Sequence, residues 1–192
     1  SGETALFYAV TGGHEPVVDA LLDAGADVNA APRDGQSPLM EAAQRGAAPL
    51  LEMLLRHGAR LDATDAVGRT ALWYAADNGG LDAVKVLAAR HANAALADRE
   101  GYTPLSRAAQ QGRAAVVEAL LQYGGDVDRP TLQGNTPLIL AADGGHTAVV
   151  QRLLGAGAKV DVRNERGNTA LMLAAAAGYK DTVQLLLAHD AD

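Results

Sequence analysis

Apolar and polar residues follow one another in the same order six times along the chain. A hydroxyl residue recurs every 33 residues, each followed two positions later by leucine; the hydroxyls are Thr4, Ser37, Thr70, Thr103, Thr136 and Thr169. No insertion or deletion interrupts this period. A strict period of this length is typical of repeat proteins, in which each copy is one supersecondary unit.

Each copy predicts a first helix that starts at the hydroxyl. Ser and Thr are good N-caps, and proline follows the hydroxyl at Pro38, Pro104 and Pro137, where a missing N–H costs nothing. A glycine stands nine positions after every hydroxyl, and it predicts the end of this helix in a left-handed backbone.

A second helix follows almost at once in each copy. Its apolar residues recur at helical spacing, as in Val17, Val18, Leu21 and Leu22, which predicts a core-facing side. A second terminating glycine comes next in four copies, but His91 and Asp190 replace it in the third and sixth. Since His and Asp enter the left-handed region more readily than most residues, we expect that conformation there too, at a modest local cost.

These residues resemble the ankyrin repeat. The family pattern is nearly complete in the fifth copy, in Gly134-Asn135-Thr136-Pro137-Leu138, Ala141-Ala142, Gly145-His146, Val149-Val150, Leu153-Leu154 and Gly157-Ala158. The resemblance implies an all-α repeat fold, an ankyrin-type solenoid of stacked helix-turn-helix units with hairpin-like fingers between them. It implies a single domain over 1–192, with repeats at about 1–31, 32–64, 65–97, 98–130, 131–163 and 164–192.

One departure from the family pattern is systematic. The histidine that follows T-P-L in the family is replaced in all six copies, by Phe7, Met40, Trp73, Ser106, Ile139 and Met172. Five of the six replacements are apolar, so we expect packing to take the place of the hydrogen-bond network between repeats in which the family's histidine usually takes part. Both end repeats keep apolar residues of the internal type, so we expect the chain to be a piece of a longer protein.

Charge and composition exclude several classes of function. The net charge is -7 and the basic residues are scattered singly, so we expect no nucleic-acid partner. The longest apolar runs are too short to cross a bilayer, so no membrane insertion is expected. We expect a soluble monomer, with the cytoplasm as the default compartment, and the absence of cysteine leaves the redox environment open.

No motif for catalysis or for a cofactor is present. The histidines recur at scaffold positions, without the close ligand spacing of a zinc site. Residues 155–160 have glycines and a lysine but lack the spacing of a phosphate loop. Acidic pairs such as Asp62 and Asp65 fall in fingers expected to be exposed, where nothing would raise a carboxyl pKa. We therefore expect no enzyme activity, no metal and no cofactor.

The resemblance implies a protein-protein interaction module that binds a partner protein or peptide through a concave groove formed by fingers and first helices. Core positions stay uniform between copies, while the residues four, seven and eight positions after each hydroxyl vary freely. Trp, Tyr and Arg dominate binding hot spots, so the candidate partner-binding residues are Arg69, Trp73, Tyr74, Asp77, Asn78, Arg99, Tyr102, Arg107, Gln110 and Gln111.

Two other interpretations remain open at this point. The repeats could be the regulatory or substrate-recruiting region of a larger multidomain enzyme. They could also be a structural spacer or an engineered scaffold, which the strict phasing and the lack of cysteine suit.

Overall fold

The computed structural model describes residues 4–192, so the first three residues of repeat 1 lie outside it. Every regular element within that range is a helix. The helices are α1 (Ala5–Thr11), α2 (Glu15–Asp23), α3 (Pro38–Gln44), α4 (Ala48–Arg56), α5 (Ala71–Asn78), α6 (Leu81–Ala89), α7 (Pro104–Gln110), α8 (Ala114–Gln122), α9 (Pro137–Asp143), α10 (Thr147–Gly155), α11 (Ala170–Ala177) and α12 (Lys180–Leu187). They form two compact units, unit 1 (Ser1–Asp98) and unit 2 (Arg99–Asp192), each containing three repeats.

The first helix of each repeat begins where the hydroxyl pattern predicts. All six Ser and Thr side chains cap their helices by accepting the backbone N–H three residues ahead. In α9, for example, Thr136 Oγ1 accepts from the N–H of Ile139 at 3.3 Å. This bond satisfies one of the donors that a helix start leaves without an intrahelical partner, so the start of each first helix is confirmed.

The helices also end as predicted. The glycine after each first helix has positive φ, between 67° and 84°, and so do the four glycines after second helices. His91 and Asp190 have φ of 64° and 61°, and they are the only non-glycine residues with positive φ in the described part of the chain. The expectation of a left-handed backbone at both residues is confirmed.

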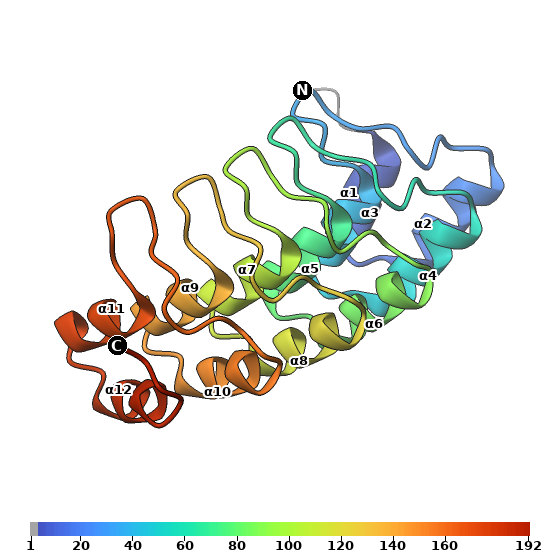
Figure 1. Ribbon diagram of the computed structural model, residues 1–192. Coiled ribbons are helices and arrows are strands. Elements are labelled where there is room, and N and C mark those ends of the chain that lie inside the picture. Colours follow the sequence, from blue (N-terminus) through green and yellow to red (C-terminus); the bar gives the residue numbers. More distant parts are fainter. Residues whose placement is uncertain (1–3) are drawn as a thin grey trace. The chain divides into compact units, whose positions relative to one another are not determined.

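Within unit 1 the helices form two rows. α3 packs against α1 and α5, while α4 packs against α2 and α6, so first helices stack on first helices and second helices on second helices (Figure 1). Small residues such as Ala42, Ala43, Ala75 and Ala76 are fully buried between the rows. Their size allows the helix backbones to approach closely.

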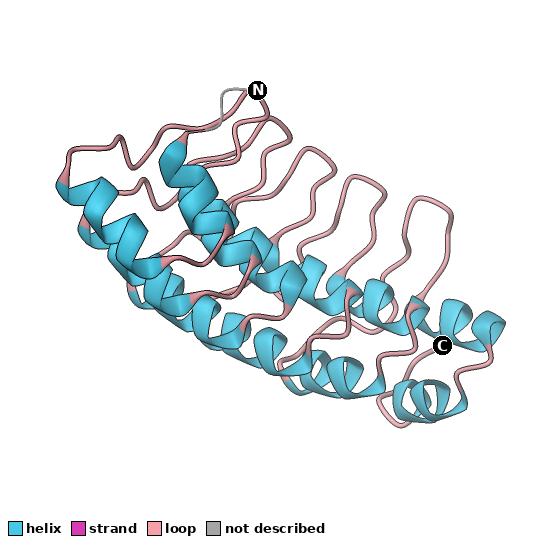
Figure 2. Cartoon of the chain, turned by 180° about the vertical axis from the view of Figure 1, so that it is seen from behind, coloured by secondary structure: helices cyan, strands magenta, loops and turns pink. Residues whose placement is uncertain are grey.

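Unit 2 repeats this arrangement. α9 packs against α7 and α11, and α10 packs against α8 and α12, as the view from behind also shows (Figure 2). Leu105, Leu138 and Leu153 are buried in its core, which consists of aliphatic side chains and alanines.

The predicted core is wrong at Val17. Its side chain is 49% exposed, whereas Val18 beside it is fully buried. The cause is positional, because Val17 occupies the side of α2 that faces away from α3 and α4, and no described repeat covers that side. The helical spacing identified an apolar face but could not tell which part of it a neighbour would bury.

The variable positions are also not uniformly exposed. Tyr74 and Leu140, four residues after their hydroxyls, are buried, although variation between repeats suggested contact with solvent or a partner. At Tyr74 the finger of residues 63–69 covers the side chain, since Asp65 of that finger accepts a hydrogen bond from the Tyr74 hydroxyl.

Fingers lead from each second helix to the next first helix. The finger of residues 63–69 closes in a turn in which the N–H of Gly68 donates to the carbonyl of Asp65 at 3.1 Å, and the N–H of Asp65 donates to the carbonyl of Arg69 at 3.0 Å. The finger is therefore hairpin-like, as predicted. It also bonds to the preceding finger, since the N–H of Ala66 donates to the carbonyl of Asp34 at 2.8 Å. Unit 2 has equivalent bonds from Leu132 to Glu100 and from Glu165 to Gln133.

Candidate functional site

Asp65 organises the finger of residues 63–69 in unit 1. Its Oδ1 accepts the N–H groups of Val67 and Arg69, both at 2.9 Å, and its Oδ2 accepts the hydroxyl of Tyr74 at 2.7 Å. One carboxylate thus joins the finger turn to α5. The expectation that Asp65 lies in an exposed finger with nothing apolar nearby is wrong, because the residue is half-buried against the ring of Tyr74.

Burial raises the pKa of Tyr74 to about 12, and the hydrogen bond to Asp65 adds to the rise. Both causes act in the same direction, because a phenolate in this place would lose its hydration and would stand beside a carboxylate. The phenol therefore stays protonated and acts as a hydrogen-bond donor at physiological pH.

Two further contacts fix this corner of unit 1. The guanidinium carbon of Arg69 lies 4.7 Å from the ring centroid of Trp73, a cation–π distance. The rings of Trp73 and Tyr74 meet edge to face, with centroids 5.4 Å apart. Both aromatic side chains are buried. Arg69, Trp73, Tyr74 and Asp65 therefore form one packed cluster at the base of the finger.

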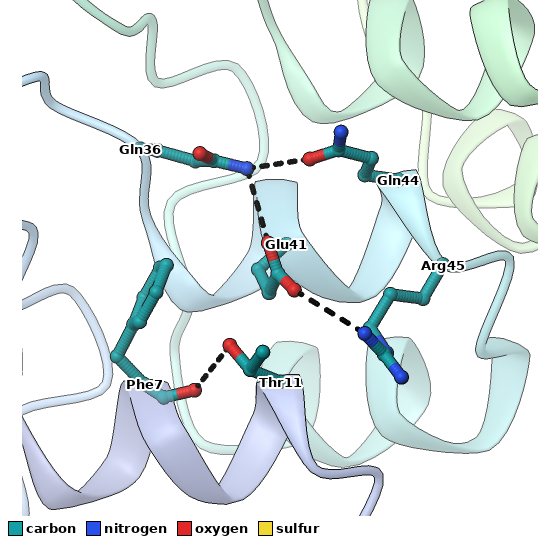
Figure 3. Close-up of polar contacts among 6 residues, drawn as sticks. All are labelled: Phe7, Thr11, Gln36, Glu41, Gln44 and Arg45. Atoms are coloured by element: carbon teal, nitrogen blue, oxygen red, sulfur yellow. Dashed lines mark hydrogen bonds and ion pairs between the residues drawn. The ribbon is translucent and has the colours of Figure 1, made fainter.

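A hollow of about 340 Å³ lies beside this cluster. Its lining comes from two fingers and two first helices, and consists of Asp34, Gln36, Gln44, Asp65, Ala66, Val67, Arg69 and Tyr74. On its α3 side, Gln36 Nε2 donates to Gln44 Oε1 at 2.7 Å and to Glu41 Oε2 at 3.2 Å (Figure 3). Glu41 also pairs with Arg45 at 3.7 Å. The hollow thus has a polar rim whose side chains hold one another in place.

Unit 2 has a larger hollow of about 480 Å³ at the corresponding place. It is lined by finger residues and by α9 and α11, namely Glu100, Tyr102, Gln133, Asn135, Asp143, Asn164, Glu165, Arg166, Asn168 and Leu173. The side chain of Asn164 donates to Asn135 Oδ1 at 2.8 Å, and its own Oδ1 accepts the N–H groups of Arg166 and Asn168. Asn164 therefore holds the turn of its own finger, as Asp65 does in unit 1, but its further bond reaches the preceding finger and not a helix.

The predicted binding residues divide between the two units. In unit 1, Trp73 and Tyr74 are buried, Arg69 and Asp77 are half-buried and Asn78 is exposed. In unit 2, Arg99 is exposed, and the half-buried residues are Tyr102, Arg107, Gln110 and Gln111. The structure brings Arg69, Trp73 and Tyr74 into one cluster, and joins Arg107 to Gln110 by a 2.6 Å hydrogen bond between their side chains.

The two hollows contain only three of those ten residues, which are Arg69, Tyr74 and Tyr102. The emphasis on aromatic residues and arginine missed the acidic and amide side chains that form most of the lining. A signal for them was available, since Gln133, Asn135, Glu165 and Asn168 all occupy finger positions that vary from repeat to repeat.

One group of possible metal ligands lies outside both hollows. Asp19, Asp23 and His57 can bring one ligand atom each to within 4.8 Å of one another, and all three are exposed. Sequence spacing could not reveal this group, because His57 follows α4 while both aspartates lie on α2. Exposed acidic groups of this kind are common on protein surfaces, and this one carries no buried ligand.

A family comparison agrees with this architecture. The chain is a helical repeat protein, and a family model described as ankyrin repeats in three copies matches residues 1–65, 39–131 and 124–192. The chain belongs to the ankyrin-repeat family, whose members are generally non-catalytic modules for protein-protein interaction. A search of curated proteins found no match. Among the described helices, none is long and apolar enough to cross a membrane.

Proposed function

We propose that this chain binds a partner protein or peptide through the fingers and first helices of its repeats. The observation that carries the proposal is the contrast between scaffold and lining. The caps, terminating glycines and core leucines are nearly uniform between repeats, whereas the side chains around the two hollows differ from repeat to repeat. Loops on a rigid scaffold are the usual place for binding residues.

The contacts within each unit support a preorganised surface. Asp65 and Asn164 each tie their finger turn by several hydrogen bonds, and neighbouring fingers share a backbone bond. A partner would therefore meet fingers that are already ordered, which lowers the entropic cost of binding.

The proposed contact residues are those expected from the sequence, with distinct roles within unit 1. Asp77 and Asn78 offer polar groups at the end of α5, while the buried rings of Trp73 and Tyr74 support Arg69 and the finger. In unit 2, Arg99, Tyr102 and Arg107 offer a guanidinium, a phenol and a second guanidinium, accompanied by Gln110 and Gln111. Arginine and tyrosine are among the residue types that are enriched in hot spots.

Affinity capture with the full chain, followed by titration calorimetry on the captured protein, tests this proposal. A unit 1 variant carries Asp77→Ala and Asn78→Ala, and a unit 2 variant carries Arg99→Ala, Tyr102→Ala and Arg107→Ala. A control carries Glu52→Ala and Lys85→Ala, which change exposed side chains on α4 and α6. We expect the unit 1 variant, the unit 2 variant or both to weaken binding by tenfold or more, since a hot spot is worth about 2 kcal/mol. The control should bind like the wild type.

The proposal fails if the unit 1 variant and the unit 2 variant both keep wild-type affinity. A loss of affinity in the control alone would contradict the proposal directly, because the partner would then contact the second helices.

A further inference from the structure

The two hollows occupy the same place in their repeats. Every residue that lines the unit 1 hollow has its counterpart, three repeats further along the chain, in the lining of the unit 2 hollow. Glu100 and Tyr102, from the finger before, complete the unit 2 lining. The walls of the unit 1 hollow come from the second and third repeats, so a hollow at this place does not depend on the repeat at either end of the chain.

In unit 1 the chain supplies its own cation to the hollow. Arg69 is one of the lining residues, and its guanidinium carbon lies 4.7 Å from the ring centroid of Trp73. The phenol of Tyr74 and the carboxylate of Asp65 line the same hollow. A guanidinium, a phenol ring and a carboxylate therefore come together there within a single chain.

The unit 2 hollow has no cation at that position and has more room. Asn168 replaces Arg69, and Leu173 replaces Tyr74, so two large side chains give way to smaller ones. The hollow is accordingly larger, at about 480 Å³ against about 340 Å³. Sites for small ligands typically measure about 300–1,000 Å³, so one long side chain of a partner fits into this space.

The unit 2 hollow also gains negative charge. Asp143 and Glu165 stand at positions where unit 1 has neutral residues, and both side chains are exposed. Neither carboxylate has an ion-pair partner within residues 4–192. Glu100 is a third lining carboxylate, whereas Arg166 is the only lining cation. A concave surface in which one sign of charge prevails attracts the opposite charge.

We propose that the unit 2 hollow binds an arginine side chain from a basic segment of the partner. This inference rests on the proposed function and narrows the partner to one with such a segment. The carboxylates of Asp143 and Glu165 accept N–H groups of the guanidinium, which presents five donors in a planar fork. Leu173 packs against the methylene groups of the side chain, and Tyr102 adds an aromatic ring to the wall.

Nuclear magnetic resonance on the full chain labelled with ¹⁵N tests the hollow with a defined probe. The probe is Nα-acetyl-arginine amide, and Nα-acetyl-citrulline amide, which has nearly the same shape and no charge, is its control at equal ionic strength. We expect saturable shifts of the side-chain amides of Asn135 and Asn168, with a dissociation constant on the order of 1 mM for a ligand of this size. Citrulline should bind about tenfold more weakly, since its hydrogen bonds to the carboxylates are not charge-assisted on both sides.

Three variants show whether the carboxylates of the hollow are responsible. Asp143→Asn with Glu165→Gln should weaken binding of the arginine probe about tenfold. Asn168→Arg puts a guanidinium of the chain into the hollow, as in unit 1, and should weaken it as well. The control, Glu52→Gln with Asp82→Asn, removes the same charge from exposed sites on α4 and α6 and should bind like the wild type. The amide spectrum of each variant also shows whether it is folded.

Titration calorimetry with the captured partner separates this inference from the proposed function. We expect Asp143→Asn with Glu165→Gln to weaken partner binding about tenfold. If this variant binds the partner normally while the unit 1 or unit 2 alanine variant does not, the arginine inference is wrong and the proposed function stands. The inference is also overturned if the arginine probe causes no saturable shifts at the hollow, if citrulline binds equally well, or if the control variant loses the probe as strongly as the hollow variants do.

Discussion

The hydroxyl of Tyr74 donates a 2.7 Å hydrogen bond to the carboxylate of Asp65, and this bond joins α5 to the turn of the finger before it. The same carboxylate accepts two backbone N–H groups of that turn. A side chain of the helix therefore determines where the finger stands, and the shape of the unit 1 hollow depends on this pair.

Removing the hydroxyl of Tyr74 should lower the stability of unit 1 without disturbing its core. We expect Tyr74→Phe to lower the free energy of unfolding by about 1 to 2 kcal/mol, because a buried ring keeps its packing while a charge-assisted hydrogen bond is lost. Urea unfolding followed by circular dichroism measures the change. Tyr8→Phe, which alters a tyrosine that is 60% exposed, is the matched control and should change stability less. An equal effect of the two substitutions would show that the Asp65 bond contributes nothing.

The contribution of Tyr74 should disappear at high pH. Its pKa is raised from 10.0 to about 12 on folding, so the unfolded chain releases this proton first. The stabilisation is fully present below pH 10 and is lost as the pH rises through about 12. We expect the stability difference between wild type and Tyr74→Phe to shrink over this range. In parallel, the difference between their tyrosinate absorbance titrations should have its midpoint near 12, and a midpoint near 10 would contradict the burial argument.

His91 offers a route to a more stable chain. It is held at φ 64° after α6, where four other repeats have glycine. Replacing it by glycine should raise the free energy of unfolding by about 1 kcal/mol, because the left-handed conformation penalises a Cβ atom. Gly58→Ala is the reverse experiment at the equivalent position, where an added Cβ would meet no atom within 4 Å. It should cost about 1 kcal/mol for the same reason. A loss of stability in His91→Gly would mean that the imidazole makes a compensating contact.

Gly145 should be less replaceable than Gly157, although both have positive φ. A Cβ built there would lie 2.7 Å from the ring of Tyr179 in the next repeat, whereas one on Gly157 would meet nothing within 4 Å. We expect Gly157→Ala to cost about 1 kcal/mol through backbone strain alone, and Gly145→Ala to cost about 2 kcal/mol or more.

A double-mutant cycle isolates the steric part of that cost. Measured in the Tyr179→Ala background, the loss of unfolding free energy caused by Gly145→Ala should fall to that of Gly157→Ala, because the ring that obstructs the new methyl group is gone. If the two substitutions are simply additive, the ring moves aside freely and the contact does not constrain the repeats.

Local features of the fold follow from the sequence because they depend on short stretches of backbone. A hydroxyl followed by proline begins a helix, and a glycine nine positions after the hydroxyl ends it, whatever surrounds them. Even the left-handed backbone at His91 and Asp190 could be predicted, since only the repeat register and the preferences of those residue types were needed. The family, and with it the general role in protein binding, follows from six such copies in phase.

Burial and the composition of the hollows were decided by tertiary structure. Tyr8 and Tyr74 occupy the same position in their repeats, yet one is 60% exposed and the other 7%. The same holds for Val17 and Val149, because the exposure of a residue in a stacked repeat depends on whether another repeat covers it. Likewise, Asp65 accepts a hydrogen bond from Tyr74 only because the finger lies against α5 in the folded unit. A repeat sequence determines the shape of each unit, while its neighbours determine which side chains remain available to a partner.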